Sequence, residues 1–269
     1  DWLHPEELLE FLASQAGVVG PVLFVVLGFA FWSAAAAPRA LSREDRFLLA
    51  FILPPLIIIL AQALISRAHA NWAAAAYPAA IVWLAGRLCA ERTGKPILIG
   101  ALATQLALGA LILTIGVAPA LGDRIGLSDA LKRNRGWAET AEVVAARAEA
   151  GDYSAILTDH RATFFELSYY LRDRREALPP LRMWLLREAP LNHAEAVAPL
   201  RAEESQNILS VQTVPRYEPF LAADFQRYTP LGAADIALGG GEIRRLVFGR
   251  AHGFAPMPRD AAFAARLED

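Results

Sequence analysis

The sequence predicts a helical membrane region followed by an α/β domain, and the distribution of charge is the main reason. Residues 1–122 contain 14 of the 54 charged side chains, and residues 123–269 contain the other 40. An apolar run of about 18 residues or more can cross a hydrocarbon core of roughly 30 Å. Four stretches without Asp, Glu, Lys or Arg reach that length: residues 11–38, 47–66, 68–86 and 96–122.

Loop charges predict how these four spans are oriented. Short cytoplasmic loops are enriched in Lys and Arg, and the loops at 38–46 and 87–95 carry most of the basic residues of the membrane region. We therefore expect residues 1–16 to form an outward-facing segment and residues 17–122 to form four membrane helices. Residues 123–269 are then an α/β domain on the same outward side.

Prolines and aromatic residues add detail to the spans. Pro54 and Pro55 predict a break in the second span, which would require packing against protein to satisfy the freed backbone groups. Trp72, Tyr77 and Trp83 in the third span have the character of side chains that anchor a helix at the membrane interface. This interfacial interpretation is the alternative to a functional role for Trp72 and Tyr77.

The second part alternates between helical and strand patterns, as α/β domains do. Apolar spacing predicts helices over 136–150, 162–173 and 215–228, and buried or alternating runs predict strands over 153–160, 181–186 and 207–214. Residues 233–254 predict a hairpin that turns through Gly239–Gly241. This glycine run lacks the following Lys of a phosphate-binding loop.

Composition excludes several classes of protein. Cys89 is the only cysteine, which excludes a disulfide-stapled scaffold. The isoelectric point near 6.3 gives no electrostatic basis for binding nucleic acid.

The polar cluster that best predicts a site begins the third span. The segment RAHANWAAAAY places a cation, an imidazole, an amide and two aromatic side chains with polar edges next to the membrane surface: Arg67, His69, Asn71, Trp72 and Tyr77. Arg and His can bind a lipid phosphate through charge-assisted hydrogen bonds, to which Asn and Tyr would add donors. The alternative is a solvated turn beside an aromatic belt.

Two weaker candidates lie in the α/β domain. Asp159 and His160 follow a predicted strand, where α/β proteins often bind ligands. Asn192 and His193 lie in a predicted loop and could bind a metal ion or a sugar. The alternative for Asp159 is a helix N-cap, and a loop His without a second His or Cys nearby is usually structural.

Several short motifs resemble the C-terminal portion of bacterial glycosyltransferase family 39. This family includes relatives of protein O-mannosyltransferases, lipid A aminoarabinose transferases and lipopolysaccharide-core galacturonosyltransferases. The motifs occur in the family's order: Gln15-x-Gly17-x-x-Gly20-Pro21, His69-Ala70-Asn71-Trp72 with Tyr77-Pro78, GW at 136–137, ILTDHR at 156–161, YYLRD at 169–173 and LNHAEA at 191–196.

This resemblance implies a GT-C membrane fold in the bacterial inner membrane with the C-terminal domain in the periplasm. Such enzymes transfer a sugar from a polyprenyl-phosphate carrier to a lipid, polysaccharide or protein acceptor. A carboxylate in the first outer loop acts as general base or positions the acceptor, and a divalent metal or basic residues stabilise the departing phosphate. We expect Arg67, His69, Asn71, Trp72 and Tyr77 to bind the carrier phosphate or donor.

The acidic first outer loop of the family has no counterpart in this sequence. Glu6, Glu7 and Glu10 are expected to form a solvated turn of a helix, and no metal ligand is assigned. We therefore expect the catalytic residues to lie upstream of Asp1, in a longer protein of which this chain is the C-terminal part.

Two other classes of function compete with the transferase. Four spans that anchor a non-enzymatic binding or assembly domain would explain why no complete acid/base pair is evident. A transporter is disfavoured because the four spans show neither an internal repeat nor a charge within them.

Overall fold

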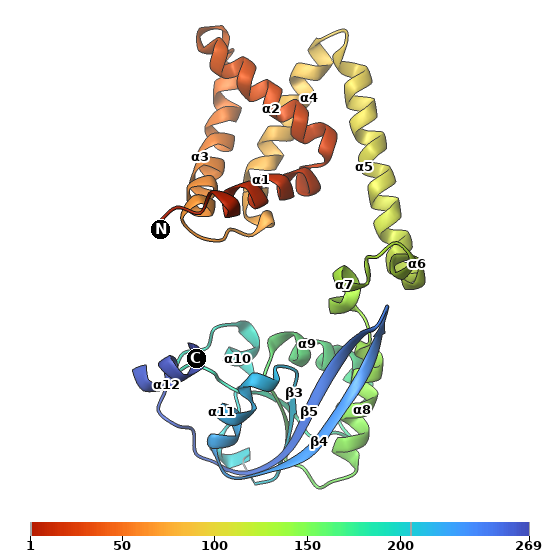
Figure 1. Cartoon of the computed structure of the whole chain (residues 1–269), viewed down its shortest axis with the longest axis vertical. Helices are drawn as coiled ribbons and strands as arrows, with labels where there is room; N and C mark the ends of the chain where they lie inside the picture. Colours follow the sequence, from red (N-terminus) through yellow and green to blue (C-terminus); the bar gives the residue numbers. More distant parts are fainter. Residues whose placement is uncertain (1, 205, 269) are drawn as a thin grey trace. The chain divides into compact units, whose positions relative to one another are not determined.

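The computed structural model describes residues 2–204 and 206–268 and divides the chain into two compact units (Figure 1). The first, the membrane unit, comprises residues 1–117, and the second, the α/β unit, comprises residues 118–269. This division lies five residues before the predicted one at 122/123. The difference arises because helix α6 (Pro119–Arg124) packs on strand β4 (Phe225–Gly239) of the α/β unit.

The membrane unit is helical throughout. Its elements in chain order are α1 (Pro5–Val19), α2 (Pro21–Ala36), the 3-10 helix η1 (Pro38–Ala40), α3 (Arg43–Ile65), η2 (Ala70–Ala76), α4 (Tyr77–Ala90) and α5 (Gly94–Val117). Among the described residues, three helical stretches are long and apolar enough to cross a membrane, or four if the bent pair α1–α2 counts as one span. The chain thus has a membrane part and an α/β part.

The first predicted span is bent by 116° between α1 and α2. Gly20 lies at the break with a φ of 91°, a left-handed conformation that favours glycine. The Gln105 side chain of α5 donates a hydrogen bond to the Val19 carbonyl at 2.8 Å and occupies the space that a Cβ of residue 20 would need. Helix α1 therefore extends across the predicted boundary at 16/17.

The predicted break at Pro54 and Pro55 is wrong. Helix α3 is continuous through both prolines, and only 17% of its most apolar window is buried, so the expected enclosure by protein does not occur within the described residues. The helix begins with a capping box, in which Ser42 accepts from the Asp45 N–H and Asp45 accepts from the Ser42 N–H, each at 3.0 Å.

Trp83 belongs to the core of the membrane unit and is not an exposed anchor. Its side chain is 1% exposed. The indole N–H donates to the Asp45 carboxylate at 2.7 Å, and Arg87 lies over the same ring, 5.4 Å from its centroid. The indole N–H of this buried ring is thus satisfied by a carboxylate in the first turn of α3.

The α/β unit contains one five-stranded sheet in the order β2-β1-β3-β5-β4. Strands β2, β1 and β3 are parallel, and the β4–β5 hairpin joins β3 in antiparallel orientation. Its other elements in chain order are α7 (Ser128–Leu131), η3 (Lys132–Asn134), α8 (Trp137–Glu149), β1 (Ala155–Thr158), α9 (Arg161–Tyr170), η4 (Arg172–Arg174), β2 (Leu181–Met183), α10 (His193–Val197), η5 (Ala202–Glu204), β3 (Ile208–Gln212), η6 (Pro215–Tyr217), α11 (Glu218–Ala223), β5 (Glu242–Phe254) and α12 (Ala261–Glu268).

Both faces of this sheet are covered. Helices α8 and α9 pack on one face with Ile156 and Leu209, while α11 packs on the other with Leu157 and Ile208. The alternation of these buried residues along β1 and β3 is the period of two that a strand imposes. The predicted helices at 136–150 and 162–173, the three predicted strands and the hairpin are confirmed.

One predicted helix is too long. Residues 215–228 were expected to be helical, but the helix ends at Ala223 and the chain continues as β4. Phe225 pairs with Phe254 of β5, and their rings pack 5.3 Å apart. Pairing across the sheet therefore overrides a local pattern that has helical spacing.

Candidate functional site

The strongest predicted cluster lies in the connection between α3 and α4, here called the Arg67 segment (residues 66–76). Helix α3 ends at Ile65, residues 67–69 are not helical, and η2 follows before α4 begins at Tyr77. Pro78 lies in the first turn of α4, where its missing N–H costs no helical hydrogen bond. The Arg67 segment is thus a turn with a polar sequence at one end of the membrane unit.

A buried amide on α1 supports this turn. Gln15 is 3% exposed, and its side-chain nitrogen donates to the carbonyl of Ala70 and to that of Phe11, each at 3.2 Å. Its side-chain oxygen accepts from the Tyr77 hydroxyl at 2.5 Å. The His4 N–H also donates to the Leu64 carbonyl at 2.7 Å, so α1 is tied to both ends of the turn.

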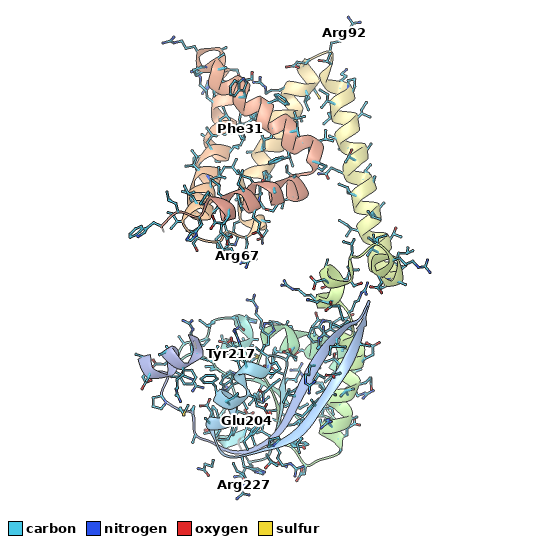
Figure 2. All side chains as sticks on the ribbon, in the orientation of Figure 1. Phe31, Arg67, Arg92, Glu204, Tyr217 and Arg227 are labelled. Carbon is cyan, nitrogen blue, oxygen red and sulfur yellow. The ribbon has the colours of Figure 1, made fainter. Side chains whose placement is uncertain are left out.

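The polar side chains on the outside of the turn are exposed. Figure 2 shows Arg67 at the end of the membrane unit opposite to Arg92. The His69 ring packs edge-on against Trp72 with 5.2 Å between ring centroids. Neither the Arg67 nor the Asn71 side chain forms a hydrogen bond or an ion pair within the part of the chain that the structure describes, so both can bind an incoming group.

Tyr77 differs from the other four predicted residues. Its side chain is 7% exposed and its hydroxyl donates to Gln15, which makes it part of the support beneath the Arg67 segment. Gln15 itself was not among the predicted site residues. Two signals could have identified it: its place in the motif that begins at Gln15, and its polar side chain within an otherwise apolar stretch, which needs a partner when buried.

Asp159 connects the ends of β1 and β3. Its carboxylate accepts the Thr213 N–H at 3.0 Å, the Val214 N–H at 2.8 Å and the Thr213 hydroxyl at 3.2 Å. Burial raises the pKa of the Asp159 carboxyl, and the two backbone N–H groups oppose that shift. The carboxylate is therefore engaged in holding the loop after β3, and the predicted alternative of an N-cap falls instead to His160, whose Nδ1 accepts the Ala162 N–H at 3.2 Å.

Asn192 is the N-cap of α10. Its side-chain oxygen accepts the Glu195 N–H at 3.2 Å, and its side-chain nitrogen donates to the Glu195 carboxylate at 2.7 Å. His193 is exposed on the first turn. Among the described residues, no hydrogen bond or ion pair joins this pair to Asp159 or His160, so the structure gives no evidence that the four form one site.

Replacing Asp159 with alanine is expected to weaken the connection between β1 and β3. The change leaves the Thr213 and Val214 N–H groups without their acceptor, at a cost of about 1–3 kcal/mol for each that stays buried. Hydrogen–deuterium exchange of the full chain in detergent would measure faster opening of the 211–216 backbone. His160→Ala removes only the N-cap of α9 and should cost about 1 kcal/mol in that helix. Equal effects of the two variants on the 211–216 backbone would contradict this role of Asp159.

A second feature that sequence patterns did not indicate is a buried ion pair. Asp224 is fully buried and accepts the Trp184 indole N–H at 2.7 Å, the Met257 N–H at 2.9 Å and both terminal nitrogens of Arg259. Arg259 also donates to the Leu185 carbonyl at 2.9 Å. Arg259 lines a cavity of about 500 Å³. The other residues that line the cavity are Leu185, Arg187, Glu188, Pro199, Leu200, Phe254, Pro256, Met257, Pro258 and Asp260.

The side chains do not provide an evident metal site. Across residues 2–204 and 206–268, no group of three or more His, Cys, Asp or Glu side chains is placed to hold a metal ion. The divalent metal that the family resemblance implies therefore has no ligand set in this part of the chain.

Comparison with known proteins gives a distant glycosyltransferase relationship. The chain is 32% identical over 169 residues to the lipid A galacturonosyltransferase RgtD of Rhizobium johnstonii. The match covers 61% of this chain and 34% of that protein, so the chain spans about a third of the length of its relative. No family model and no solved structure matches the chain.

Proposed function

We propose that this chain is the C-terminal part of a membrane glycosyltransferase that takes its sugar from a polyprenyl-phosphate carrier. The acceptor is a lipid, a polysaccharide or a protein at the periplasmic face of the bacterial inner membrane. The similarity to a lipid A galacturonosyltransferase over 169 residues is the observation that carries this proposal. The apolar helices of the membrane unit agree with a membrane location.

The orientation of the chain supports placing the site at the periplasmic face. The basic loops at 38–46 and 87–95 should face the cytoplasm. Arg67 lies at the end of the membrane unit opposite to Arg92, which belongs to one of those loops (Figure 2). We therefore propose that the Arg67 segment faces the periplasm, where a lipid-linked donor would be used.

Within this proposal the exposed face of the Arg67 segment binds the carrier phosphate. The Arg67 guanidinium can donate two parallel hydrogen bonds to phosphate oxygens, and the Asn71 amide can add a third. These donors would stabilise the negative charge that grows on the phosphate as the sugar leaves. Trp72 and His69 provide an aromatic wall, and Gln15 with Tyr77 holds the backbone in position. We place the general base in a part of the protein outside this chain.

Replacing Arg67 with alanine in the intact protein is expected to lower kcat/KM for sugar transfer by about 10- to 100-fold. This is the kinetic equivalent of losing one charge-assisted hydrogen bond of about 1.5–3 kcal/mol. Transfer from a polyprenyl-phosphate sugar by the purified protein in detergent would measure it. Arg92→Ala, which changes an exposed Arg at the other end of the membrane unit, is the matched control, and unchanged transfer in Arg67→Ala would overturn the phosphate role.

The alternative is a non-enzymatic binding or assembly domain anchored by the membrane unit. The open cavity of about 500 Å³ beside Arg259 is the feature of the α/β unit on which such a binding role would rest. Comparing this chain with a version extended upstream of Asp1 separates the two functions. Transfer only by the extended form supports the enzyme, whereas no transfer by either form with several donor sugars supports the binding domain.

A further inference from the structure

Residues 118–134, here called the connecting segment, expose apolar side chains at the start of the α/β unit. The segment contains α6, α7 and η3. Leu121, Ile125 and Leu127 are 41%, 57% and 40% exposed. Arg124 and Arg133 are also exposed, and among the described residues neither side chain has an ion pair or hydrogen bond. The exposed surface of this segment therefore combines apolar side chains with cations.

The connecting segment is held firmly against the β4–β5 hairpin. Asp123 accepts hydrogen bonds from Arg135 at 2.6 Å and from Ser128 at 2.8 Å. Arg135 also donates to the carbonyls of Leu238 at 3.1 Å and Pro119 at 2.8 Å. Figure 1 shows α7 beside the tip of this hairpin. The exposed apolar residues are therefore part of a fixed surface of the α/β unit.

The hairpin tip is shaped to receive this segment. Gly239 and Gly240 have φ values of 89° and 58°, a region that other residues rarely adopt. A Cβ on Gly240 would collide with the Ser128 side chain, and one on Gly239 would crowd Asp123 and Arg135. The close approach of these side chains to the turn, together with the positive φ values, explains why the turn requires glycine at both positions.

The chain itself indicates what covers the exposed surface. The connecting segment begins one residue after the end of α5, whose 24 residues have a mean hydropathy of 2.1 over their most apolar window. A helix of that length extends about 36 Å, which is long enough to span the hydrocarbon core. The residues that directly follow such a span are expected at the level of the lipid headgroups.

We propose that the connecting segment docks the α/β unit onto the membrane surface, with Leu121, Ile125 and Leu127 inserted among the headgroups. Segments of this kind place apolar side chains at the boundary between acyl chains and headgroups. Arg124 and Arg133 contact the phosphates of anionic lipids, which attract cations close to the membrane. The occupant of this surface is thus the lipid of the same membrane that α5 crosses.

A fluorescence experiment on the full chain in proteoliposomes tests the insertion. Cys89 is the only cysteine and is replaced by serine, and a single cysteine is then introduced as Ile125→Cys and labelled with a fluorophore. Lipids that carry a nitroxide near the headgroup should quench this label strongly. The matched control is Arg227→Cys, an exposed position on β4 that lies about 40 Å from the tip at Gly239 by strand rise.

Quenching at residue 125 but not at residue 227 is the expected result. An unquenched label at 125, or equal quenching at both positions, would overturn the proposal, and neither readout depends on sugar transfer. A second arm combines Arg124→Glu with Arg133→Glu. It should reduce quenching at residue 125 in vesicles that contain phosphatidylglycerol and leave it unchanged in phosphatidylcholine alone. Equal quenching before and after the double change in both lipids would overturn the role of the two arginines.

Discussion

Replacing Arg259 with alanine is expected to lower the free energy of unfolding of the α/β unit by about 3–5 kcal/mol, the usual cost of removing one partner of a buried ion pair. Asp224 is fully buried, and the Arg259 side chain is 9% exposed. Without the guanidinium, the buried Asp224 carboxylate would have, among the described residues, only the Trp184 indole N–H and the Met257 backbone N–H as hydrogen-bond donors.

The geometry of this pair makes lysine a poor substitute. Arg259 places one terminal nitrogen on each carboxylate oxygen of Asp224, and it also lies over the Phe263 ring, 4.3 Å from its centroid. An ammonium group keeps the charge but cannot form two parallel hydrogen bonds. Arg259→Lys should therefore lower the free energy of unfolding, but by less than Arg259→Ala.

Hydrogen–deuterium exchange of the full chain in detergent would measure these differences as opening free energies. The affected backbone should include 218–224 and 255–263, because the Ala255 N–H also donates to the Asp224 carbonyl at 2.8 Å. Arg187→Ala is the matched control: Arg187 lines the same cavity but is exposed, and such surface changes usually stay within about 0.5 kcal/mol. If the two alanine variants open alike, the ion pair does not stabilise this region.

Sequence patterns predicted correctly those elements whose structure is set by residues close together in the chain. Strands β1 and β3 are short runs of fully buried residues, and their burial on both faces is visible in the sequence as continuous apolar character. The Gly239–Gly241 turn was predictable for a similar reason, since glycine itself supplies the required conformation. The end of α8 was also predictable, because Gly151 follows its last residues.

Two features that the sequence patterns did not indicate involve residues far apart in the chain. The stretch 11–38 has no charge and was counted as one span, but it bends by 116° at Gly20, where Gln105 of α5 donates a hydrogen bond to the Val19 carbonyl. The end of α11 depends on the pairing of Phe225 with Phe254. A charge count or a helical period contains no information on such partners, so neither could reveal these features.

The candidate site shows the same division. Arg67, His69, Asn71 and Trp72 attract attention because polar residues next to a membrane span are uncommon, and all four are exposed in the structure. The hydrogen bond between Gln15 and Tyr77 beneath them was not predictable, because the two residues are 62 positions apart. The polar residues of the Arg67 segment can be read directly from the sequence, whereas the contacts with α1 that hold the segment cannot.

Replacing Gln15 with leucine is therefore expected to release the Arg67 segment from α1. Leucine has a similar size but leaves the Tyr77 hydroxyl without its acceptor and removes the side-chain donor to the Ala70 carbonyl, at about 1–3 kcal/mol for a polar group left unpaired in the interior. Hydrogen–deuterium exchange of the full chain should show faster opening of residues 66–76 with little change in the middle of α3. Gln62→Leu is the matched control, because Gln62 is exposed on α3 and its side chain contacts no polar partner among the described residues.

A double-mutant cycle with Tyr77→Phe tests whether the two side chains act as one unit. Tyr77→Phe removes only the hydroxyl that donates to Gln15 at 2.5 Å. If the amide and the hydroxyl stabilise the Arg67 segment through each other, the double variant should cost less than the sum of the single variants, since directly bonded residues are coupled. Strict additivity would show instead that Gln15 acts through Ala70 alone. The position of the Arg67 segment would then depend on the hydrogen bond from Gln15 to the Ala70 carbonyl and not on Tyr77.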